Sequence, residues 1–492
     1  MPPSTAGING VTCDSRLVKP GFAFVAVPGF KRDGAEFVPE ALRCGAALVV
    51  AEREIRGIEA PVAIVPDARE ALSTLACAAF GYPSEGMAVY GITGTNGKTT
   101  SCYALYSILA AAYTPEKCGL LSTAEKICGG ERSPAIRTTP EAVEVQGTLR
   151  KMLDAGVEHA VLEVSSHGVA LKRIEGTRFA GALFTNLTRD HLDLHGSMEE
   201  YYRAKRELFR WVSPEGPKLA NADDPYGRRL LKEISGVNTF GATEDVDYRV
   251  ESVRFTQGGT AFLLRHPNGL LEIESPLLGS YNVENVAGAA ALALASGVGE
   301  EAVARGARKM GQVPGRFERI SPPGSTVHER FGFEVVVDYA HTDAELEAVL
   351  KVARTVAEQG RGEDSFDSSG RLLCVFGAAG DRDGAKRPLM GRVATELAEL
   401  SIITTDDAYT EDPGKIAREV AAGAKDGPGR YEVVLNRRAA IEQALRAAKS
   451  GDVVVLAGKG HERVQHLPEG DVHFHDASVA RELLKELQRE GG

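Results

Sequence analysis

Residues 87–112, MAVYGITGTNGKTTSCYALYSILAAA, decide the fold of this chain. The apolar run 87–92 predicts a short buried strand, the glycine-rich segment after it predicts a tight turn, and residues 99–112 are typical of a helix. A strand, a glycine loop and a helix in this order indicate the start of a nucleotide-binding α/β domain. Further apolar runs at 159–164 and 181–187 alternate with helix-length segments, which predicts a mostly parallel sheet.

The glycine loop 91–100 is suited to bind phosphate. Its glycines let backbone N–H groups approach phosphate oxygens, Lys98 can reach the β- and γ-phosphates, and the hydroxyl of Thr99 can bind Mg²⁺. The loop departs from the strict P-loop pattern, because Ile92 stands five residues before Gly97. The plain alternative is an ordinary glycine turn before a helix. The loop leaves open whether the phosphate is hydrolysed, transferred, or used to activate a substrate.

Two further segments follow the neighbouring strands. Glu163, in EVSSHGVALKR (163–173), ends one apolar run and is placed to hold Mg²⁺ beside the loop. His191, in TNLTRDHLDLHG (185–196), follows the next strand, and its place at the same sheet edge favours a metal ligand. The alternatives are a buried structural glutamate and a hydrogen-bonded loop histidine, and we interpret His195 in the latter way.

The whole sequence is predicted to form three α/β domains. Residues 1–84 are predicted to form short strands and a helix around 35–44. Residues 85–314 contain the loop domain with an antiparallel insertion near 247–275, and a boundary falls near 313–320. Residues 315–492 carry five apolar runs separated by helix-length segments, which predicts a doubly wound, Rossmann-like sheet with ligands at the carboxyl ends of its strands. Residues 360–370 are polar and rich in Gly and Ser, and predict a mobile surface loop.

Composition excludes several classes of protein. The chain has 492 residues, 57 Lys and Arg against 68 Asp and Glu, and a net charge of −11, which disfavours a nucleic-acid or anionic membrane surface as the main partner. No apolar run approaches the roughly 18 residues that span a bilayer. The first residues lack the pattern of a secretory signal, and the seven scattered cysteines lack CxxC pairs. We therefore expect a cytoplasmic protein with reduced thiols.

The motifs along the chain resemble, in order and spacing, those of the Mur ligases. They are GTNGKTT (94–100), EVSSHG (163–168), FTNLTRDHLD (184–193), YYRAKRELF (201–209), NADD (221–224), GSYNVENVAGA (279–289), PGRFE (314–318) and VDYAHT (337–342). SRLVKPGFAFVAVPG (15–29), GDRDGAKRPLM (380–390), EDP (411–413) and GKGHE (458–462) are similar to the branch that adds a diamino acid. Folylpolyglutamate synthase shares the ATP loop, but the first and last of these four motifs are not expected in it.

The resemblance implies an ATP-dependent amide ligase of cell-wall precursor synthesis. ATP would phosphorylate the D-glutamate of UDP-N-acetylmuramoyl-L-alanyl-D-glutamate, and the amine of a diamino acid would displace the phosphate. Two anions meet in such a reaction, so cations must offset their charge. The resemblance makes Lys98, His191 and Lys205 catalytic, with Mg²⁺ bound by Thr99, Glu163, His191 and a carbamylated Lys205. The local residues alone predict that Lys205 is a solvated helix lysine.

The same resemblance implies two sets of binding residues. For ATP they are Gly94, Thr95, Asn96, Gly97, Lys98, Thr99, Thr100, Asn285, Arg316 and Asp338, with Asn221 and Asp224 as weaker candidates near the base. For the UDP-sugar-peptide they are Ser15, Phe30, Lys31, Arg32, Thr138, Thr139, Ser165 and Arg173. Two positions depart from the family. Leu171 stands where a polar side chain is common, and Arg137 stands where an amide is frequent, although its guanidinium could bind an anion.

The added amino acid is predicted from residues 406–409, Asp406, Asp407, Ala408 and Tyr409. Family members specific for meso-diaminopimelate resemble one another in a DNPR motif here, whose Arg clamps the distal carboxylate. Because a phenol replaces that guanidinium, Asp406, Asp407 and Glu462 could instead face a distal ammonium. Arg382 and Gly458 would hold the α-carboxylate. We predict L-lysine or L-ornithine, with meso-diaminopimelate as the alternative if Arg387 supplies the clamp.

Two other classes of protein could carry the same phosphate-binding loop. A P-loop NTPase or phosphotransferase would share the loop but form no amide bond, and the sequence has no NKxD motif of the GTPases. An inactive nucleotide-binding scaffold is disfavoured by the intact Lys98, Thr99 and Glu163. We expect a monomer that binds ATP, the UDP-sugar-peptide and a diamino acid, and neither nucleic acid nor membrane.

Overall fold

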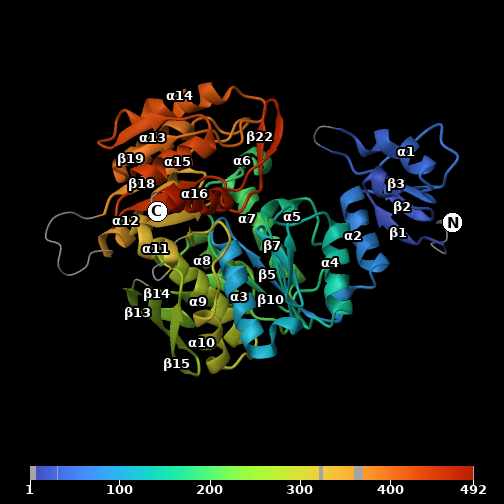
Figure 1. Cartoon of the computed structure of the whole chain (residues 1–492). Coiled ribbons are helices and arrows are strands. Elements are labelled where there is room, and N and C mark those ends of the chain that lie inside the picture. The colour runs from blue at the N-terminus through green and yellow to red at the C-terminus, as the bar shows by residue number, and fades with distance from the viewer. Residues whose placement is uncertain (1–6, 30–31, 257, 321–324, 360–369, 491–492) are drawn as a thin grey trace. The chain divides into compact units, whose positions relative to one another are not determined.

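The computed structural model describes residues 7–29, 32–256, 258–320, 325–359 and 370–490 (Figure 1). The chain forms two compact units. The first comprises Met1–Arg254, Ala261–Ser275 and Ser280–Met310, and the second comprises Phe255–Thr260, Pro276–Gly279 and Gly311–Gly492. Phe30, Lys31 and most of the loop predicted at 360–370 lie outside the described residues.

The N-terminal part of the first unit is a four-stranded parallel sheet. Its strands, in spatial order, are β1 (Gly10–Thr12), β2 (Phe22–Val25), β3 (Leu48–Ala51) and β4 (Val62–Ile64). The helices are α1 (Val38–Arg43) and α2 (Ala68–Ala79), with 3₁₀ turns at Ser15–Leu17 and Gly34–Phe37. Apolar residues fill both faces of this sheet, as expected for parallel strands.

The central sheet has eleven strands and contains the glycine loop. Its spatial order is β15-β14-β13-β12-β11-β10-β5-β9-β6-β7-β8. The strands are β5 (Ala88–Thr93), β6 (Cys118–Leu121), β7 (Glu125–Cys128), β8 (Glu131–Pro134), β9 (His159–Glu163), β10 (Gly181–Phe184), β11 (Lys218–Asn221), β12 (Val237–Gly241), β13 (Tyr248–Thr256), β14 (Gly259–His266) and β15 (Gly269–Ser275). From β12 to β6 all neighbours are parallel, which confirms the predicted sheet.

The segment predicted as an insertion extends one edge of this sheet as β13, β14 and β15. Helices α3 (Lys98–Tyr113), α9 (Ser280–Ala295) and α10 (Glu300–Arg308) lie side by side against the sheet (Figure 1). The other helices here are α4 (Ala142–Asp154), α5 (Ser166–Ala170), α6 (Leu192–His195), α7 (Met198–Glu207) and α8 (Pro225–Glu233), with 3₁₀ turns at Pro83–Glu85, Pro115–Lys117 and Leu208–Trp211.

The second unit is built on a six-stranded sheet in the order β16-β17-β21-β18-β19-β20. The strands are β16 (Glu318–Arg319), β17 (Glu334–Asp338), β18 (Leu372–Phe376), β19 (Leu400–Ile403), β20 (Arg430–Val433) and β21 (Val453–Ala457), with a separate hairpin of β22 (Val464–Leu467) and β23 (Gly470–His473). The helices are α11 (Thr326–Phe331), α12 (Asp343–Gln359), α13 (Lys386–Leu397), α14 (Pro413–Ala424), α15 (Arg437–Ala447) and α16 (Asp476–Glu490).

All five long strands of this sheet are parallel, and β16 pairs antiparallel with β17. Separate apolar clusters pack on its two faces, so the predicted doubly wound fold is confirmed. The register aligns Asp338 with Ala457 and Phe376 with Ile403, which brings the carboxyl ends of the strands, and the motifs that follow them, to one edge.

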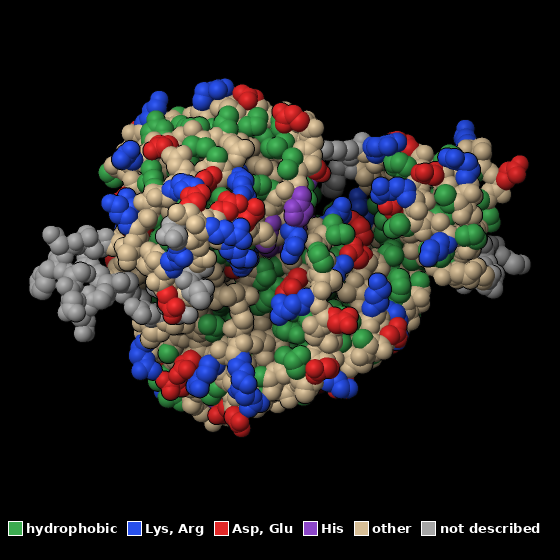
Figure 2. All heavy atoms as spheres, in the orientation of Figure 1, with side chains coloured by type: hydrophobic (Ala, Val, Ile, Leu, Met, Phe, Trp, Pro, Cys, Tyr) green, Lys and Arg blue, Asp and Glu red, His purple; other side chains and the backbone are tan. Residues whose placement is uncertain are grey.

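Within the described ranges, no helix combines the length and apolarity that crossing a bilayer requires. On the face shown in Figure 2, acidic and basic side chains of the described residues are interspersed and do not gather by sign.

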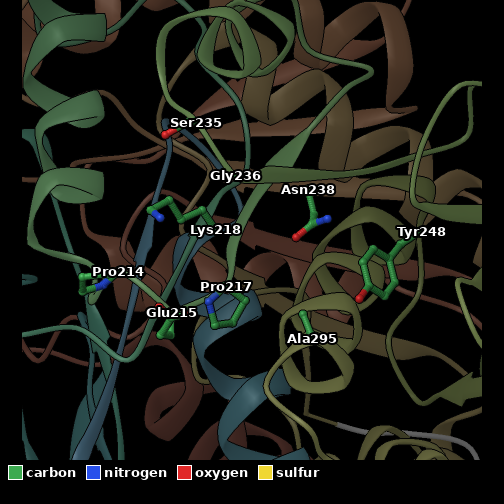
Figure 3. Close-up of a pocket in the computed structure, with 10 residues that line it drawn as sticks. Pro214, Glu215, Pro217, Lys218, Ser235, Gly236, Asn238, Tyr248 and Ala295 are labelled. Carbon is green, nitrogen blue, oxygen red and sulfur yellow. The ribbon is translucent and has the colours of Figure 1, made fainter.

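A hollow of about 430 Å³ lies at the amino ends of β11 and β12 (Figure 3). Lys218, Asn238, Tyr248 and Ala295 are among the residues that line it. Ligands of parallel sheets bind at the carboxyl ends of the strands, and the motif residues lie there. The hollow is therefore distinct from the candidate site described next.

Candidate functional site

The glycine loop joins β5 to α3 through two glycines with positive φ. Gly94 has φ 152° and Gly97 has φ 81°, a region that favours glycine. A Cβ on Gly94 would lie 1.8 Å from Oγ1 of Thr185, and one on Gly97 would lie 2.0 Å from Oδ1 of Asn285. The loop therefore needs glycine at both positions for conformation and for space. The first-turn N–H groups of α3, which have no helical acceptor, follow directly.

The loop is fastened to the segment after β10. The N–H groups of Thr95 and Asn96 donate to the backbone oxygen and to Oδ1 of Asn186, at 2.9 and 2.8 Å. The hydroxyl of Thr185 donates to the carbonyl of Asn96 at 2.6 Å. Two N–H groups of the predicted phosphate cradle are thus occupied, and the first turn of α3 offers the phosphate donors. Sequence reasoning missed Asn186, although FTNLTRD was recognised as a motif.

Two lysines approach the loop from different helices. Nζ of Lys98, at the start of α3, donates to the carbonyl of Thr95 at 2.7 Å. Nζ of Lys205, on α7, donates to the carbonyl of Gly94 at 2.5 Å and lies 4.5 Å from the Tyr201 ring centroid. Lys205 is only 1% exposed, so the local prediction of a solvated lysine is wrong. Burial, with a contribution from Lys98, lowers the pKa of Lys205 well below its usual range.

Glu163 lies next to this pair at the end of β9 and is 1% exposed. Its Oε1 accepts hydrogen bonds from the hydroxyls of Thr99 at 3.0 Å and Thr123 at 2.8 Å, and its Oε2 accepts from the Thr123 N–H at 2.8 Å. The register of β5 with β9 places Ile92 opposite Glu163 and accounts for this meeting. A buried carboxylate and a threonine hydroxyl are hard oxygen donors of the kind Mg²⁺ prefers.

Three histidines and a tyrosine gather beside the loop. The ring of His191 is 4.7 Å from that of His167, and the ring of His195 is 5.0 Å from that of Tyr201. His191 has φ 52° and is exposed, with Nε2 at 3.3 Å from Asp190. The sequence placed His191 at this edge, but did not single out His167. His195, interpreted as a loop residue, belongs to the same aromatic group.

The other predicted ATP residues of the first unit lie around α9 and β11. Asn285 is buried and donates from Nδ2 to Asn282 at 3.1 Å, beside Gly97. Asn221 donates to Glu284 at 3.3 Å. Asp224 caps α8 by accepting the N–H groups of residues 226 and 227, and also accepts the N–H of Leu187. Asp224 therefore has a structural role.

The predicted UDP-sugar-peptide residues of the central domain form one group. The Thr139 hydroxyl donates to the Glu163 carbonyl at 2.9 Å and accepts the N–H of Ser165 at 2.9 Å. Arg173 donates to the Thr139 carbonyl at 3.0 Å and to Glu141 at 2.6 Å. The hydroxyls of Thr138 and Thr123 lie 2.9 Å apart, within hydrogen-bonding distance. This group is joined to the loop through Glu163.

Of the remaining residues predicted to bind this substrate, two are described in the N-terminal sheet domain. Ser15 is buried and donates to Glu40 at 2.5 Å, whereas Arg32 is exposed and pairs with Glu36 at 2.9 Å. Of the two departures from the family, Leu171 is half-buried, and exposed Arg137 pairs with Glu141 at 2.9 Å.

In the second unit, Asp338 ends β17 and organises a turn. Its carboxylate accepts the N–H groups of Phe317 at 2.6 Å and Ala340 at 2.8 Å, and burial raises the pKa of Asp338. The Arg316 guanidinium lies 4.6 Å from the centroid of the Tyr339 ring, which is 5.1 Å from the His461 ring. Arg316 and Asp338, predicted to contact ATP, thus share one cluster. Tyr339 was not predicted.

The predicted amino-acid residues cluster around an unpredicted lysine. Nζ of Lys459 lies 2.7 Å from Asp407, 2.8 Å from Glu462 and 4.0 Å from Asp406. Lys459 is 0% exposed. Burial alone would lower the pKa of Lys459, but the three carboxylates together raise it. A Cβ on Gly458 would lie 2.3 Å from Asp406, so glycine is needed there.

Tyr409 and Arg387 bear on the predicted choice of amino acid. Tyr409 has φ 49° and stacks on His466, with ring centroids 5.2 Å apart. Arg387 is 3% exposed and pairs with Glu411 at 2.7 Å and Glu419 at 2.6 Å. Its guanidinium is therefore already engaged, which argues against Arg387 as the carboxylate clamp. Arg382 is exposed and lies 6.0 Å from the Tyr409 ring centroid, while Ala408 is buried.

Comparison with known proteins identifies the family. Three family models match the chain: the Mur ligase family catalytic domain over residues 7–80, the Mur ligase middle domain over 92–293, and the Mur ligase glutamate ligase domain over 315–460. The chain therefore belongs to the Mur ligase family, whose members are ATP-dependent ligases that form amide bonds.

One curated relative and two solved structures are informative. The UDP-N-acetylmuramoyl-L-alanyl-D-glutamate–2,6-diaminopimelate ligase of Gloeobacter violaceus is 41% identical, over 98% of this chain and 95% of its own. A solved structure described as the same ligase has a TM-score of 0.65 and 30% identity, and covers 98% of this chain and 95% of its own. The MurF ligase of Thermotoga maritima, solved with ADP, has a TM-score of 0.63 at 20% identity, over 98% of this chain and 99% of its own. These names favour diaminopimelate over the predicted L-lysine or L-ornithine.

Proposed function

We propose that this ligase uses ATP to join the amine of 2,6-diaminopimelate to the D-glutamate of UDP-N-acetylmuramoyl-L-alanyl-D-glutamate, as a cytoplasmic monomer in peptidoglycan precursor synthesis. The observation that carries the substrate assignment is 41% identity over 98% of the chain to a relative named for this reaction. The phosphate loop, with two lysines and a buried glutamate around it, supports the chemistry. The second candidate, a phosphotransferase that forms no amide bond, has no observation in its favour.

The acceptor carboxylate and the phosphate of ATP are both anionic, so the site must bring like charges together. The first turn of α3 and the Lys98 ammonium would bind the phosphates. Arg173, Thr139, Ser165 and Thr138 would orient the sugar-peptide, because they form one hydrogen-bonded group joined to Glu163. Ser15 and Arg32 of the N-terminal domain, with Phe30 and Lys31, would bind its UDP-sugar end. Asn285, Arg316 and Asp338 would contact ATP.

Thr99, Glu163 and His191 fit Mg²⁺. The fit rests on the donor set, because the Glu163 carboxylate and the Thr99 hydroxyl are hard oxygen ligands 3.0 Å apart beside the phosphate loop. A bound Mg²⁺ would offset phosphate charge and polarise the reacting oxygens. Thr123 holds the Glu163 carboxylate in place through two hydrogen bonds.

Lys205 would act as a carbamate. Its lowered pKa favours the neutral amine, and a neutral amine can attack CO₂, forming an N–C bond and releasing a proton. The product carries a negative charge in place of a cation, and can bind metal. The burial of Nζ at 2.5 Å from the Gly94 carbonyl supports this role, since an ammonium there has no carboxylate within the described hydrogen bonds.

Diaminopimelate is also compatible with the charge of the second unit. Asp406, Asp407 and Glu462 were predicted to attract a distal ammonium, but Lys459 already offsets part of their charge. The acidic residues alone therefore do not select L-lysine. Arg382 and Gly458 would bind the α-carboxylate.

One assay tests the proposal. Phosphate release is measured with ATP and Mg²⁺, with and without the UDP-sugar-dipeptide, and with meso-diaminopimelate, L-lysine or L-ornithine. We expect turnover only when both co-substrates are present, and the highest kcat/KM with meso-diaminopimelate. Turnover without an amino acid would favour the phosphotransferase, whereas a clear preference for L-lysine would refute the amino-acid assignment alone.

A further inference from the structure

The turn after β19 meets the β22–β23 hairpin through Tyr409 and His466. Their rings are nearly parallel, at 11°, with centroids 5.2 Å apart. The N–H of Tyr409 donates to the carbonyl of His466 at 3.0 Å. Arg382, in the segment that follows β18, has its guanidinium 6.0 Å from the Tyr409 ring centroid. One cation and two aromatic donors thus gather at the carboxyl edge of the sheet.

The hairpin fixes the orientation of the His466 ring. Nδ1 lies 2.7 Å from Oδ1 of Asp471, its cross-strand partner in the hairpin register. A carboxylate only accepts hydrogen bonds, so Nδ1 carries a hydrogen. Nε2 is the ring nitrogen left to meet a ligand, and with a hydrogen on it the ring donates to an anion. The side chain is 38% exposed, so a ligand can reach it.

Diaminopimelate differs from lysine by a second carboxylate, and a ligase that discriminates between them needs a donor for that group. Lys459 is fully buried among three carboxylates, and Arg387 is held by two. Both are therefore committed inside the protein. Among the described residues at Tyr409, solvent reaches the donor groups of Arg382 and His466, and Arg382 is already assigned to the α-carboxylate.

We propose that His466 is a specificity-determining residue that, with the Tyr409 hydroxyl beside it, binds the distal carboxylate of diaminopimelate. The inference rests on the proposed function for its substrate. Asp471 acts as a positioning residue, because it holds the ring through Nδ1.

The test compares His466→Ala with His473→Ala in the full chain. His473 lies on β23 of the same hairpin and is exposed, so its variant is a matched control. We expect His466→Ala to raise the KM for meso-diaminopimelate about tenfold, as loss of a charge-assisted hydrogen bond does. The kcat should stay within about twofold, and kcat/KM for L-lysine should hardly change. Asp471→Asn should act in the same direction with a smaller effect.

A rescue variant keeps the inference falsifiable if the hairpin is disturbed. Tyr409→Arg in the His466→Ala background supplies a guanidinium at the same place and should restore the KM for meso-diaminopimelate. An equal loss for both amino acids, or no loss, would overturn the role of His466. A wild-type enzyme that does not turn over meso-diaminopimelate would instead refute the substrate assignment, and the two failures are therefore distinguishable.

Discussion

Lys205 in the first unit and Lys459 in the second are both buried lysines, 1% and 0% exposed, yet their surroundings are opposite. Lys205 donates to a carbonyl and has Lys98 as a charged neighbour, and burial and this neighbour lower the pKa of Lys205. Lys459 lies among Asp406, Asp407 and Glu462, which overcome the effect of burial and raise the pKa of Lys459.

The two lysines show that the surroundings of a buried amine determine its chemical role. Where burial outweighs the acidic neighbours, as at Lys205, the neutral and nucleophilic amine is favoured; where carboxylates outweigh burial, as at Lys459, the cation is favoured and holds its neighbours. The first is suited to chemical modification at the phosphate loop. The second is suited to hold the amino-acid end of the site in shape.

The largest expected effect is on catalysis, from Lys205→Ala. If the carbamate of Lys205 positions metal and substrate, this variant should lose activity by about a hundredfold or more, because a charged group is removed from the reacting phosphates. Short carboxylic acids should partly restore phosphate release by replacing the carbamate. Lys205→Arg, which keeps a cation but cannot be carbamylated, should be as inactive as the alanine variant.

Arg203→Ala is the control, since Arg203 lies on the same helix and makes exposed ion pairs with Glu199 and Glu200. It should retain normal activity. Near-normal turnover of Lys205→Ala would show that the Lys205 side chain is not needed for catalysis. An active Lys205→Arg would show that a cation suffices there, and either result would refute the carbamate.

The next largest effect is on stability, from Lys459→Met. Removing the cation leaves buried carboxylates without their partner, which costs about 3 kcal/mol in the free energy of unfolding. Urea unfolding measures the loss. Lys415→Met, at an exposed position 3.9 Å from Glu419, should change stability little. A stable Lys459→Met variant would mean that the carboxylates become protonated at low cost.

A third prediction concerns His461, a half-buried base with the cations Arg316 and Lys459 as charged neighbours. Burial, with Arg316 as a further cause, lowers the pKa of His461 from 6.5 to about 3. The folded state therefore binds fewer protons than the unfolded state, and stability falls as the pH decreases from 6.5 towards 3. Between pH 7 and pH 4.5 this residue should account for about 2 kcal/mol of lost stability.

His461→Gln should remove that part of the acid sensitivity, whereas His473→Gln, at an exposed site, should not. Urea unfolding at the two pH values measures the difference. If both variants keep the wild-type pH dependence, the pKa of His461 does not differ between the folded and unfolded states. The predicted contribution of His461 to acid sensitivity would then be refuted.

Much of the fold and part of the site could be predicted from the sequence, because the decisive signals are local. Apolar runs marked the strands, the glycines marked the loop, and the parallel register then brought Glu163 and His191 to the edge that holds Lys98. The burial of Lys205 is not a local property. The sequence of its helix, α7, is mostly polar. The amine is removed from water only because it packs against the loop carbonyl.

Lys459 was missed for the same reason. Lys459 follows the apolar run of β21, and this position at the end of a buried strand could have marked it as a site residue. Its partners, however, come from the turn after β19 and from Glu462. The three carboxylates therefore suggested a site for the ammonium of a substrate. In the structure, Lys459 of the protein itself pairs with them. Residue types alone do not reveal which charges are already paired.

The smallest expected effect comes from Asp407→Asn, and its sign should depend on Lys459. Oδ1 of Asp407 accepts from Lys459 at 2.7 Å and from the N–H of His466 at 3.0 Å. An asparagine oxygen can accept both bonds but carries no charge, so the single variant should lose about 1 kcal/mol of stability. In the Lys459→Met background the same change removes an unpaired buried charge and should recover about 1 kcal/mol. Urea unfolding of the four proteins gives the coupling energy. If Asp407→Asn destabilises both backgrounds equally, the N–H of His466 alone holds Asp407, and the acidic residues do not determine the charge of Lys459.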